Sequence, residues 1–205
     1  MQQPFDQKLL AERLKNIKYP VHELISSRWS PRAMTGEELS DAELFSLFEA
    51  ARWAPSSYNN QPWRFLYAKR GSPEWPLFFD LMVDFNKSWA KNAATLVLAV
   101  SANLFERNGK PARTHSFDTG AAWMSLAIEA CARGYVAHGM EGFNYALAEK
   151  SLEIPPDHTV EALIAIGKRA TSDTLSPELR EREAPSPRKP LETRFFKGRF
   201  PKKST

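Results

Sequence analysis

Residues 116–133 are the segment that most constrains how this chain of 205 residues can fold. The segment predicts a helix with apolar side chains on nearly every side, rather than along one stripe. Such a helix must be buried on most of its surface, and Gly134 is a typical residue to end it. Because the chain is short enough to be one domain, we expect part of this helix to lie at an interface between subunits.

Predicted helices and strands alternate along the chain. We expect a helix at residues 7–26 that is interrupted at Pro20, and a second helix that begins at a capping box at 40–43 and ends at Pro55. Two further helices are expected at 73–91 and at 143–152. We expect strands at residues 63–68, 95–101, 135–138 and 160–166. This mixture favours a layered α/β or α+β domain.

The composition changes near Ala170. Residues 1–170 hold all of the predicted helices and strands and are expected to form the folded domain. Residues 171–205 are polar and rich in proline, which predicts an extended arm with little core of its own. From residue 186 to the end there are seven lysines and arginines and one acid, Glu192. The arm is therefore basic at its end, although the rest of the chain is close to neutral.

Several classes of protein are excluded by composition. No apolar run approaches the 18 or so residues of a membrane span, so no membrane partner is expected. Residues 1–6 lack the features of a signal peptide, and the lone Cys131 excludes an internal disulfide. Together these two features favour the cytoplasm. The four histidines show no metal-ligand spacing, so no metal site is predicted.

Two arginines flank a hydroxyl group at residues 28–32. Arg28, Ser30 and Arg32 lie just beyond a predicted helix. A guanidinium group matches phosphate with two parallel hydrogen bonds, and a serine hydroxyl adds another donor. The pattern predicts a phosphate site, and a solvated loop with two arginines is the alternative.

A second segment, residues 54–63, places hydroxyl and carboxamide groups between Pro55 and Pro62. Asparagine and glutamine carry paired donors and acceptors that suit the edge of a planar heterocycle. The same residue types are common in turns, although a turn needs fewer polar residues than this loop contains. The loop therefore predicts either a ligand contact or an elaborate turn.

Two weaker signals follow. Residues 139–143 contain Gly139 and Gly142 between a predicted strand and a predicted helix, where the backbone could approach a ligand closely. Basic residues at 167–169 and 188–189 could complete a phosphate site. Taken alone, a glycine-containing turn and ordinary surface charge explain them better than a ligand site does.

Together these segments resemble the nitroreductase family of FMN-dependent oxidoreductases, over most of the chain from about Val21 to Glu192. The motif Pro-Ser-x-x-Asn-x-Gln-Pro-Trp is the most specific part of the resemblance. The matching residues are Arg28, Ser30 and Arg32 in the first motif; Pro55, Ser56, Asn59, Gln61, Pro62 and Trp63 in the second; Glu141, Gly142 and Phe143 in the third; and Arg188, Lys189, Pro190, Leu191 and Glu192 in the last.

The resemblance implies an α+β fold in which a central, mainly antiparallel sheet is flanked by helices. It also implies an intertwined homodimer with the apolar helix 116–133 in its core. The arm at 171–205 would extend over the partner subunit and add a strand to its sheet. FMN would lie at the subunit interface and contact residues of both chains, and two-fold symmetry would give two identical sites.

The resemblance assigns cofactor-binding roles to fifteen residues. Those expected near the FMN phosphate and ribityl chain are Arg28, Trp29, Ser30 and Arg32, with Arg188 or Lys189. Those expected along the isoalloxazine from the other subunit are Pro55, Ser56, Ser57, Asn59 and Gln61. Those expected near the flavin pyrimidine ring and N5 are Asn86, Met140, Glu141 and Gly142. A lysine common in the family is replaced here by Trp89, with Lys87 as the candidate substitute.

The implied reaction is ping-pong hydride transfer from NADH or NADPH through flavin N5 to a small electron-poor acceptor, such as a nitroaromatic compound or a quinone. No catalytic side chain is expected, because the chemistry takes place on the flavin. The short segment 103–117 predicts an open pocket above it.

Two alternatives remain. The chain could bind FMN without turnover of NAD(P)H. The basic tail, with Phe195, Phe196 and Phe200 among its charges, could stack on nucleic acid bases. We do not expect nucleic acid as a partner, because the resemblance gives Arg188 and Lys189 to the cofactor.

Overall fold

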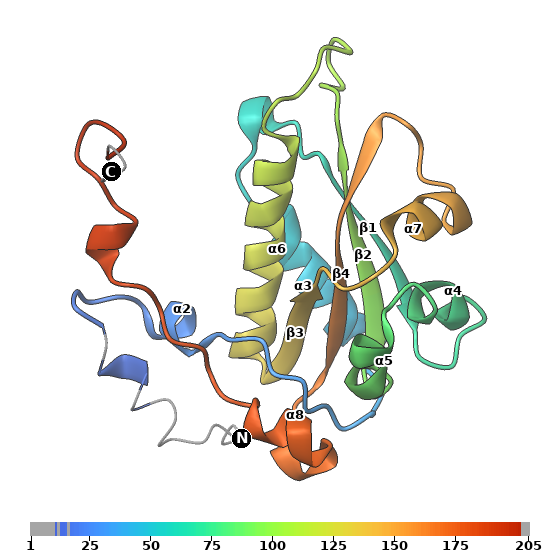
Figure 1. The fold of residues 1–205 in the computed structure, drawn as a ribbon. Coiled ribbons are helices and arrows are strands. Elements are labelled where there is room, and N and C mark those ends of the chain that lie inside the picture. Colours follow the sequence, from blue (N-terminus) through green and yellow to red (C-terminus); the bar gives the residue numbers. More distant parts are fainter. Residues whose placement is uncertain (1–10, 12, 16, 202–205) are drawn as a thin grey trace.

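A four-stranded antiparallel sheet forms the centre of the computed structural model, which describes residues 11, 13–15 and 17–201. The strands are β1 (Trp63–Lys69), β2 (Thr95–Ala102), β3 (Tyr135–Met140) and β4 (His158–Lys168), in the order β1-β2-β4-β3. All eight residues of β2 are buried, because β2 lies inside the sheet with helices on both faces (Figure 1). The predicted α+β class and all four predicted strands are confirmed.

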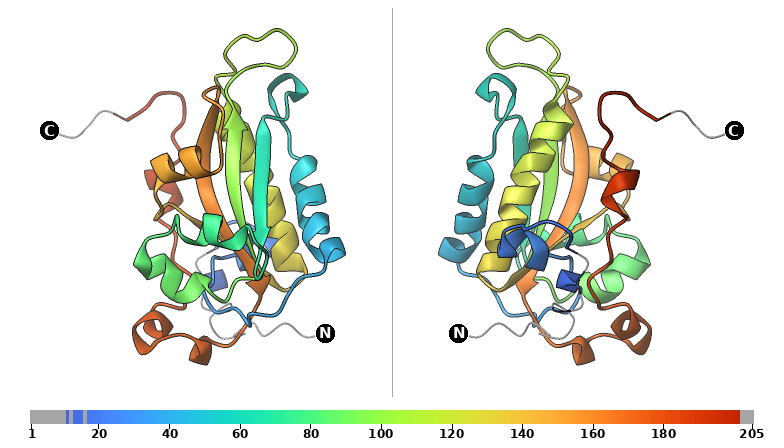
Figure 2. Two further views of the ribbon diagram at one scale, coloured as in Figure 1. Left: turned by 90° about the vertical axis from the view of Figure 1, so that its right-hand side faces the viewer. Right: turned by 90° about the vertical axis from the view of Figure 1, so that its left-hand side faces the viewer.

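Helices cover both faces of the sheet (Figures 1 and 2). They are α2 (Glu23–Ser27), α3 (Asp41–Arg52), α4 (Trp75–Phe79), α5 (Asp84–Ala90), α6 (His115–Ala132), α7 (Tyr145–Ser151) and α8 (Pro177–Glu181), with short 3-10 turns at Ser57–Asn59, Ser172–Thr174 and Leu191–Thr193. α3 and α6 pack on one face, and α4, α5 and α7 lie on the other. Of the described helices, none has the length and apolar character needed to cross a membrane.

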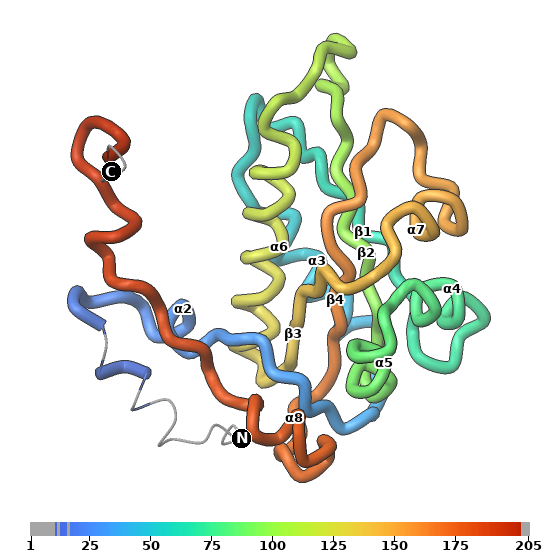
Figure 3. The backbone as a smooth tube through the Cα atoms, in the orientation of Figure 1, coloured from blue at the N-terminus to red at the C-terminus, as the bar shows by residue number. Residues whose placement is uncertain are grey.

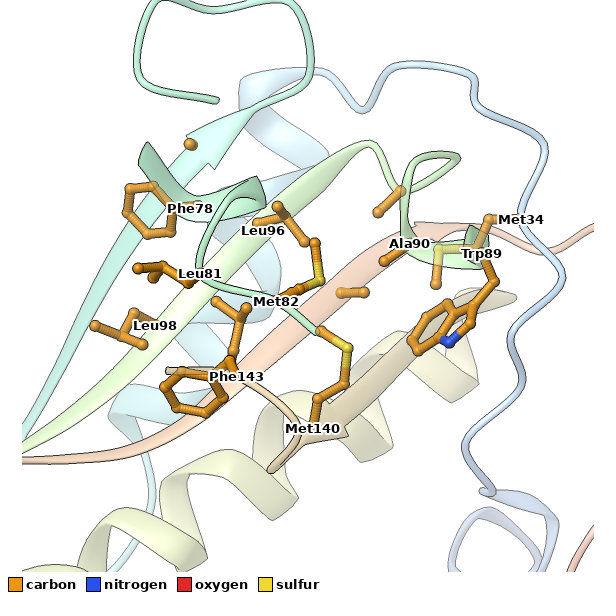
Figure 4. Packing of buried hydrophobic residues seen from close by; sticks show 14 of the residues in the cluster. Met34, Phe78, Leu81, Met82, Trp89, Ala90, Leu96, Leu98, Met140 and Phe143 are labelled. Carbon is orange, nitrogen blue, oxygen red and sulfur yellow. The ribbon is translucent and has the colours of Figure 1, made fainter. Parts of the chain in front are cut away.

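Alternating residues of the central strands divide the core into two clusters. Val97 and Ile164 face α3 and α6, whereas Leu98 and Leu163 face the opposite side. On that opposite side Phe78, Met140 and Phe143 pack together with neighbouring methionines (Figure 4). Burial on both faces explains why β2 and the end of β4 are nearly continuous apolar runs in the sequence.

The prediction of one helix over residues 73–91 is wrong. The structure has α4 and α5, and between them residues 81–83 run alongside residues 142–144. The Val83 N–H donates to the Gly142 carbonyl, and the Asn144 N–H donates to the Leu81 carbonyl. These bonds from a distant segment replace the bonds that a continuous helix would make, so tertiary contacts override the local pattern.

The prediction for residues 7–26 is only partly testable. Residues 7–10, 12 and 16 lie outside the described residues, whereas residues 11, 13 and 14 are helical. The described chain is not helical at residues 17–22, and α2 begins after His22, which caps it through its ring Nδ1. The predicted interruption at Pro20 is therefore confirmed, although the non-helical stretch is longer than one residue and the following helix runs from Glu23 to Ser27.

The helix α6 buries one face and exposes the other. Leu126 and Ala130 are fully buried against the sheet, whereas Phe117 is 80% exposed and Met124 is 36% exposed. Phe117 and Met124 are seven residues apart and so share one face of the helix, where an exposed apolar patch is a feature of surfaces that another protein covers. The predicted helix is confirmed, and its place at a subunit interface stays a prediction.

The segment after β4 begins by packing against its own chain. Leu175 and Leu179 are buried in the core cluster on the α4 and α5 side, and Glu183 is only 7% exposed. Beyond Pro185 the described residues are exposed and run beside the N-terminal segment (Figure 3), to which Lys18 and Glu192 connect them by a 2.6 Å ion pair. The division of the chain at residue 170 stays a prediction.

Candidate functional site

The segment that carries Arg28, Ser30 and Arg32 is fixed to the end of the sheet. Met34 pairs with Arg169 just after β4, and the Ala170 N–H donates to the Ala33 carbonyl at 3.1 Å. Upstream, the Pro31 carbonyl lies 2.8 Å from Nδ1 of His138 on β3. The backbone on which the two predicted phosphate-binding arginines stand is therefore held from two strands.

A buried carboxylate holds the same segment from a third direction. Glu183, just after α8, accepts hydrogen bonds from the Arg32 N–H at 2.9 and 3.0 Å and from the Ala33 N–H at 3.0 Å. A buried carboxylate is costly unless it is well hydrogen-bonded, and these backbone donors supply the bonds. The start of the C-terminal arm thus fixes the position of Arg32.

Positive charge gathers beside this segment. Burial lowers the pKa of Arg28, and the nearby Arg188 guanidinium lowers it further. Burial also lowers the pKa of Arg13, again with Arg188 and Arg28 acting in the same direction. Three guanidinium groups that repel one another form an arrangement that an anion would stabilise.

The donor set has unused capacity. Arg28 donates to Ser30 Oγ at a long 3.5 Å, and among the described residues its buried Nε finds no hydrogen-bond partner. The buried Nε of Arg32 is likewise without a partner in the described part of the chain. Buried polar groups in native structures normally have partners, so these donors fit a phosphate group.

Aromatic rings support the neighbouring cations. The Arg169 guanidinium carbon lies 4.6 Å from the centroid of the Trp29 ring. Arg32 and Arg182 lie 6.0 and 5.7 Å from the centroid of Phe85. These contacts link α5 and the C-terminal arm to the arginine-bearing segment.

Asn86 and Gly142 lie together at the edge of the sheet. The buried Asn86 side chain donates from Nδ2 to the Gly142 carbonyl at 3.0 Å. A Cβ on Gly142 would lie 2.6 Å from Asn86 Nδ2, so only glycine allows this approach. Met140 is buried in the core beside this contact, whereas Glu141 is exposed. The structure therefore brings together the residues that were predicted to lie near the pyrimidine ring and N5 of the flavin.

Trp89 belongs to the core. It is 1% exposed, and its ring centroid lies 4.6 Å from that of His138 (Figure 4 shows its position). Lys87, the other candidate for the missing lysine, lies with its Nζ 3.8 Å from Asp80 and 5.9 Å from the Phe79 ring. Trp89 thus packs against His138, whose ring contacts the Pro31 carbonyl. The ammonium group of Lys87 faces Asp80.

The polar loop at residues 54–62 has a strained backbone. Tyr58, Asn59 and Gln61 have φ values of 52°, 52° and 49°, in the left-handed region that residues other than glycine rarely adopt. Ser56 Oγ accepts the Gln61 N–H at 3.0 Å, and Asp118 accepts the Ser57 N–H at 3.0 Å. Clustered backbone strain of this kind is typical of ligand-binding sites, which favours the first of the two interpretations of this loop.

The two sets of predicted residues lie at opposite ends of α6. Ser57 contacts Asp118 in the first turn, whereas Ser27, next to Arg28, has its Oγ 3.8 Å from the Cys131 Sγ in the last turn. The axial rise of a helix places residues 118 and 131 about 20 Å apart. Within one protomer the two sets of predicted residues are therefore well separated.

The tail residues Arg188 and Lys189 are both exposed. Arg188 donates to the carbonyls of Ser186 and Pro187 and is close enough to Arg28 to lower its pKa. The structure places Arg188 beside Arg13 and Arg28, and these three residues are called the arginine cluster below.

Sequence reasoning missed Glu183 as a site-organising residue. Glu178, Glu181 and Glu183 fall in the arm at 171–205, for which the sequence predicts little core. No local pattern distinguishes the buried acid, because its partners lie 150 residues away. His138 lies on β3, and its ring contacts the arginine-bearing segment at the Pro31 carbonyl.

Comparisons with known proteins agree with this geometry. The model of the nitroreductase family matches residues 25–74 and 70–168. A solved oxidoreductase containing FMN is 45% identical, with a TM-score of 0.86 over 92% of this chain and 96% of that chain. A protein of Desulfovibrio desulfuricans, solved in complex with FMN and provisionally assigned as a nitroreductase, is 25% identical, with a TM-score of 0.70 over 90% of this chain and 100% of that one.

A curated relative, an uncharacterized 15.4 kDa protein of Mycolicibacterium smegmatis, is 34% identical over 114 residues, which are 55% of this chain and 76% of the relative. The fold and the family match together define the class: the chain is an oxidoreductase-type α+β protein, and it belongs to the nitroreductase family.

Replacement of Glu183 by glutamine tests its role in holding the segment. We expect Glu183→Gln to lower the free energy of unfolding by about 2 kcal/mol, because bonds from a buried carboxylate are lost and an amide N–H₂ faces backbone donors. Urea unfolding measures the change. Glu181→Gln, at an exposed position two residues earlier at the end of α8, is the matched control, and equal stability of the two variants would contradict the role.

His138 predicts a pH dependence of stability. Burial lowers its pKa to about 4, against 6.5 for a free histidine. The unfolded chain therefore binds a proton near pH 6.5 that the folded chain does not bind until about pH 4, so this stability is lost as the pH falls from 6.5 towards 4. The loss reaches about 3 kcal/mol for a shift of this size.

Urea unfolding of the wild type and of His138→Gln at pH 7.5 and pH 5 measures this effect. Glutamine can still donate to the Pro31 carbonyl but does not titrate. We expect the difference in stability between the two proteins to move in favour of the variant at pH 5. A difference independent of pH would contradict the assignment.

Proposed function

We propose that the protein binds FMN and transfers electrons from NADH or NADPH to small electron-poor acceptors such as nitroaromatic compounds and quinones. The observation that carries the proposal is the arginine cluster with unused donors at Arg28 and at the neighbouring Arg32. Arg32 lies 6.0 Å from the ring of Phe85, the residue that precedes Asn86 in the Asn86–Gly142 contact. It is supported by the FMN-containing relatives of the same fold. When bound, FMN would supply hydride chemistry at its N5.

The arginine-bearing segment would hold the phosphate end of the cofactor. Arg28 and Arg32 would donate to the phosphate through their unused guanidinium groups, with Ser30 Oγ as a further donor and Arg188 adding charge. Trp29, held under Arg169, would present backbone contacts to the ribityl chain. The anion would relieve the mutual repulsion of the arginines, so the cofactor would also stabilise the fold.

The contact between Asn86 and Gly142 would orient the isoalloxazine ring of FMN. Asn86 already uses its amide N–H on the Gly142 carbonyl, which leaves its carbonyl oxygen to accept from a heterocycle. Backbone N–H groups near Glu141 and Gly142 would donate towards the reactive edge of the ring. Donors fixed in advance at a position where negative charge develops stabilise that charge without reorganisation. No side chain is assigned a proton-transfer step.

The role proposed for the polar loop, contact with the flavin, requires a second copy of the chain. Pro55, Ser56, Ser57, Asn59 and Gln61 lie at the other end of α6 from the arginine cluster. A two-fold homodimer packed through the exposed face of α6 would bring this loop of one protomer to the arginine cluster of its partner. The exposed Phe117 and Met124 would then be covered.

The phosphate assignment is tested by comparing FMN with riboflavin, which lacks the phosphate. We expect Arg28→Ala to weaken FMN binding at least about tenfold and to leave riboflavin binding nearly unchanged. Quenching of flavin fluorescence measures both affinities. Arg133→Ala, which removes an exposed arginine paired with Glu129 at the end of α6, is the control. An equal loss for both flavins would contradict the assignment.

Turnover is tested by anaerobic titration of the FMN-loaded protein with NADH and then NADPH. We expect one or both to bleach the flavin absorbance and an added quinone to restore it. This experiment separates an oxidoreductase from a protein that binds FMN without turnover. A loaded protein that neither nucleotide bleaches would reject the proposed reaction while leaving FMN binding intact.

A further inference from the structure

We propose that Arg107, supported by Tyr58, forms a subsite for an anionic group on a ligand that approaches the flavin. The inference rests on the proposed function and extends it, because it names a chemical class of ligand. The preferred acceptor would be a planar, electron-poor molecule that carries a carboxylate, sulfonate or phosphate group.

The Arg107 guanidinium is stacked on aromatic rings. Its central carbon lies 4.0 Å from the centroid of the Tyr58 ring and 5.5 Å from that of Phe105. The two rings meet edge to face, with their centroids 5.7 Å apart. A stacked guanidinium keeps its in-plane N–H donors available while its position is restricted, which lowers the entropic cost of binding an anion.

Hydrogen bonds connect the two loops that carry these residues. Asn60 donates from Nδ2 to the Leu104 carbonyl at 3.2 Å, and its Oδ1 accepts the Glu106 N–H at 3.1 Å. Leu104 pairs in turn with Pro111, which closes the loop that contains Arg107. The two loops lie at the same end of the sheet (Figure 2). The position of Arg107 is therefore coupled to the strained loop that is proposed to contact the flavin.

The balance of charge in this region favours an anion. Arg64 is paired with Glu106 at 2.6 Å, and Arg64 also donates to the Gln61 carbonyl. In the described part of the chain no carboxylate forms an ion pair with Arg107. The pair of Arg64 and Glu106 is neutral as a unit, so Arg107 leaves one positive charge available at this position.

A hollow of about 630 Å³ joins Arg107 to the predicted flavin contacts. Its lining includes Asn59 and Gln61 as well as Tyr58 and Arg107. This volume lies in the range of small-molecule sites. Tyr58 is 72% exposed and offers a ring face to a planar ligand, while Asn59 and Gln61 offer amide groups. A ligand with an aromatic body and an acidic group matches this lining.

Matched pairs of acceptors test the subsite. The probes are 4-nitrobenzoate with its neutral counterpart 4-nitrobenzamide, and a naphthoquinone sulfonate with the unsubstituted naphthoquinone. We expect Arg107→Ala to raise KM about tenfold for the two anionic probes and less than twofold for the neutral ones. Arg107→Lys should recover only part of the loss, because lysine keeps the charge but not the stacked fork. Added salt should weaken the preference in the wild type.

A second readout does not depend on turnover. Benzoate and benzamide are titrated into the oxidised, FMN-loaded protein, and the shift of the flavin absorbance is followed. We expect benzoate to bind more tightly than benzamide and Arg107→Ala to remove the difference. Arg113→Ala removes an exposed charge from the same segment outside the hollow and serves as the control.

The outcomes separate the possible failures. An increase in KM confined to NADH or NADPH would support the anion subsite but identify the phosphates of the electron donor as its occupant. An equal effect on charged and neutral probes, or an equal effect of Arg113→Ala, would overturn the subsite. If no acceptor is reduced, the proposed function fails, and the benzoate titration still decides whether Arg107 binds an anion beside the flavin.

Discussion

The helix α6 is the constraint on which the rest of the structure depends. One of its faces packs on the sheet, so its direction is fixed, and its 18 residues determine how far apart the segments at its two ends lie. Asp118 in its first turn fixes the polar loop, and Cys131 in its last turn lies beside Ser27. A rigid helix of this length prevents the loop and the arginine cluster of one protomer from meeting. The same helix exposes an apolar face through which two copies would join them.

The arginine cluster shows how a site of like charges is kept in place. Arg13, Arg28 and Arg188 repel one another, so the backbone beneath them needs support that does not depend on a bound anion. Glu183 and His138 provide it by bonding the backbone at Arg32, Ala33 and Pro31. The arginine-bearing segment is therefore held by groups that lie beneath it, and the start of the C-terminal arm supplies one of them.

Local patterns predicted the fold well where the chain follows its own periodicity. The capping box of Ser40 and Glu43 is present at the start of α3, and the apolar run at 95–101 is a strand buried on both faces. The prediction failed at residues 73–91, because hydrogen bonds between residues 81–83 and 142–144 are invisible to local periodicity. The motifs singled out the arginine-bearing segment and the polar loop, but their separation along α6 could not be read from the sequence. Glu183 could not be found either, since its partners are remote in sequence.

The central claim is that each FMN site combines the arginine cluster of one protomer with the polar loop of its partner. Mixed dimers test it directly: Arg28→Ala and Asn59→Gly chains are co-expressed with different tags and purified by both. Glycine tolerates the positive φ at residue 59, so the second variant removes the amide without adding strain. Each variant alone should bind FMN weakly. The account predicts that the mixed dimer binds one FMN per two chains with the affinity of the wild type, because one of its two sites is intact. Weak binding at every site of the mixed dimer would contradict it.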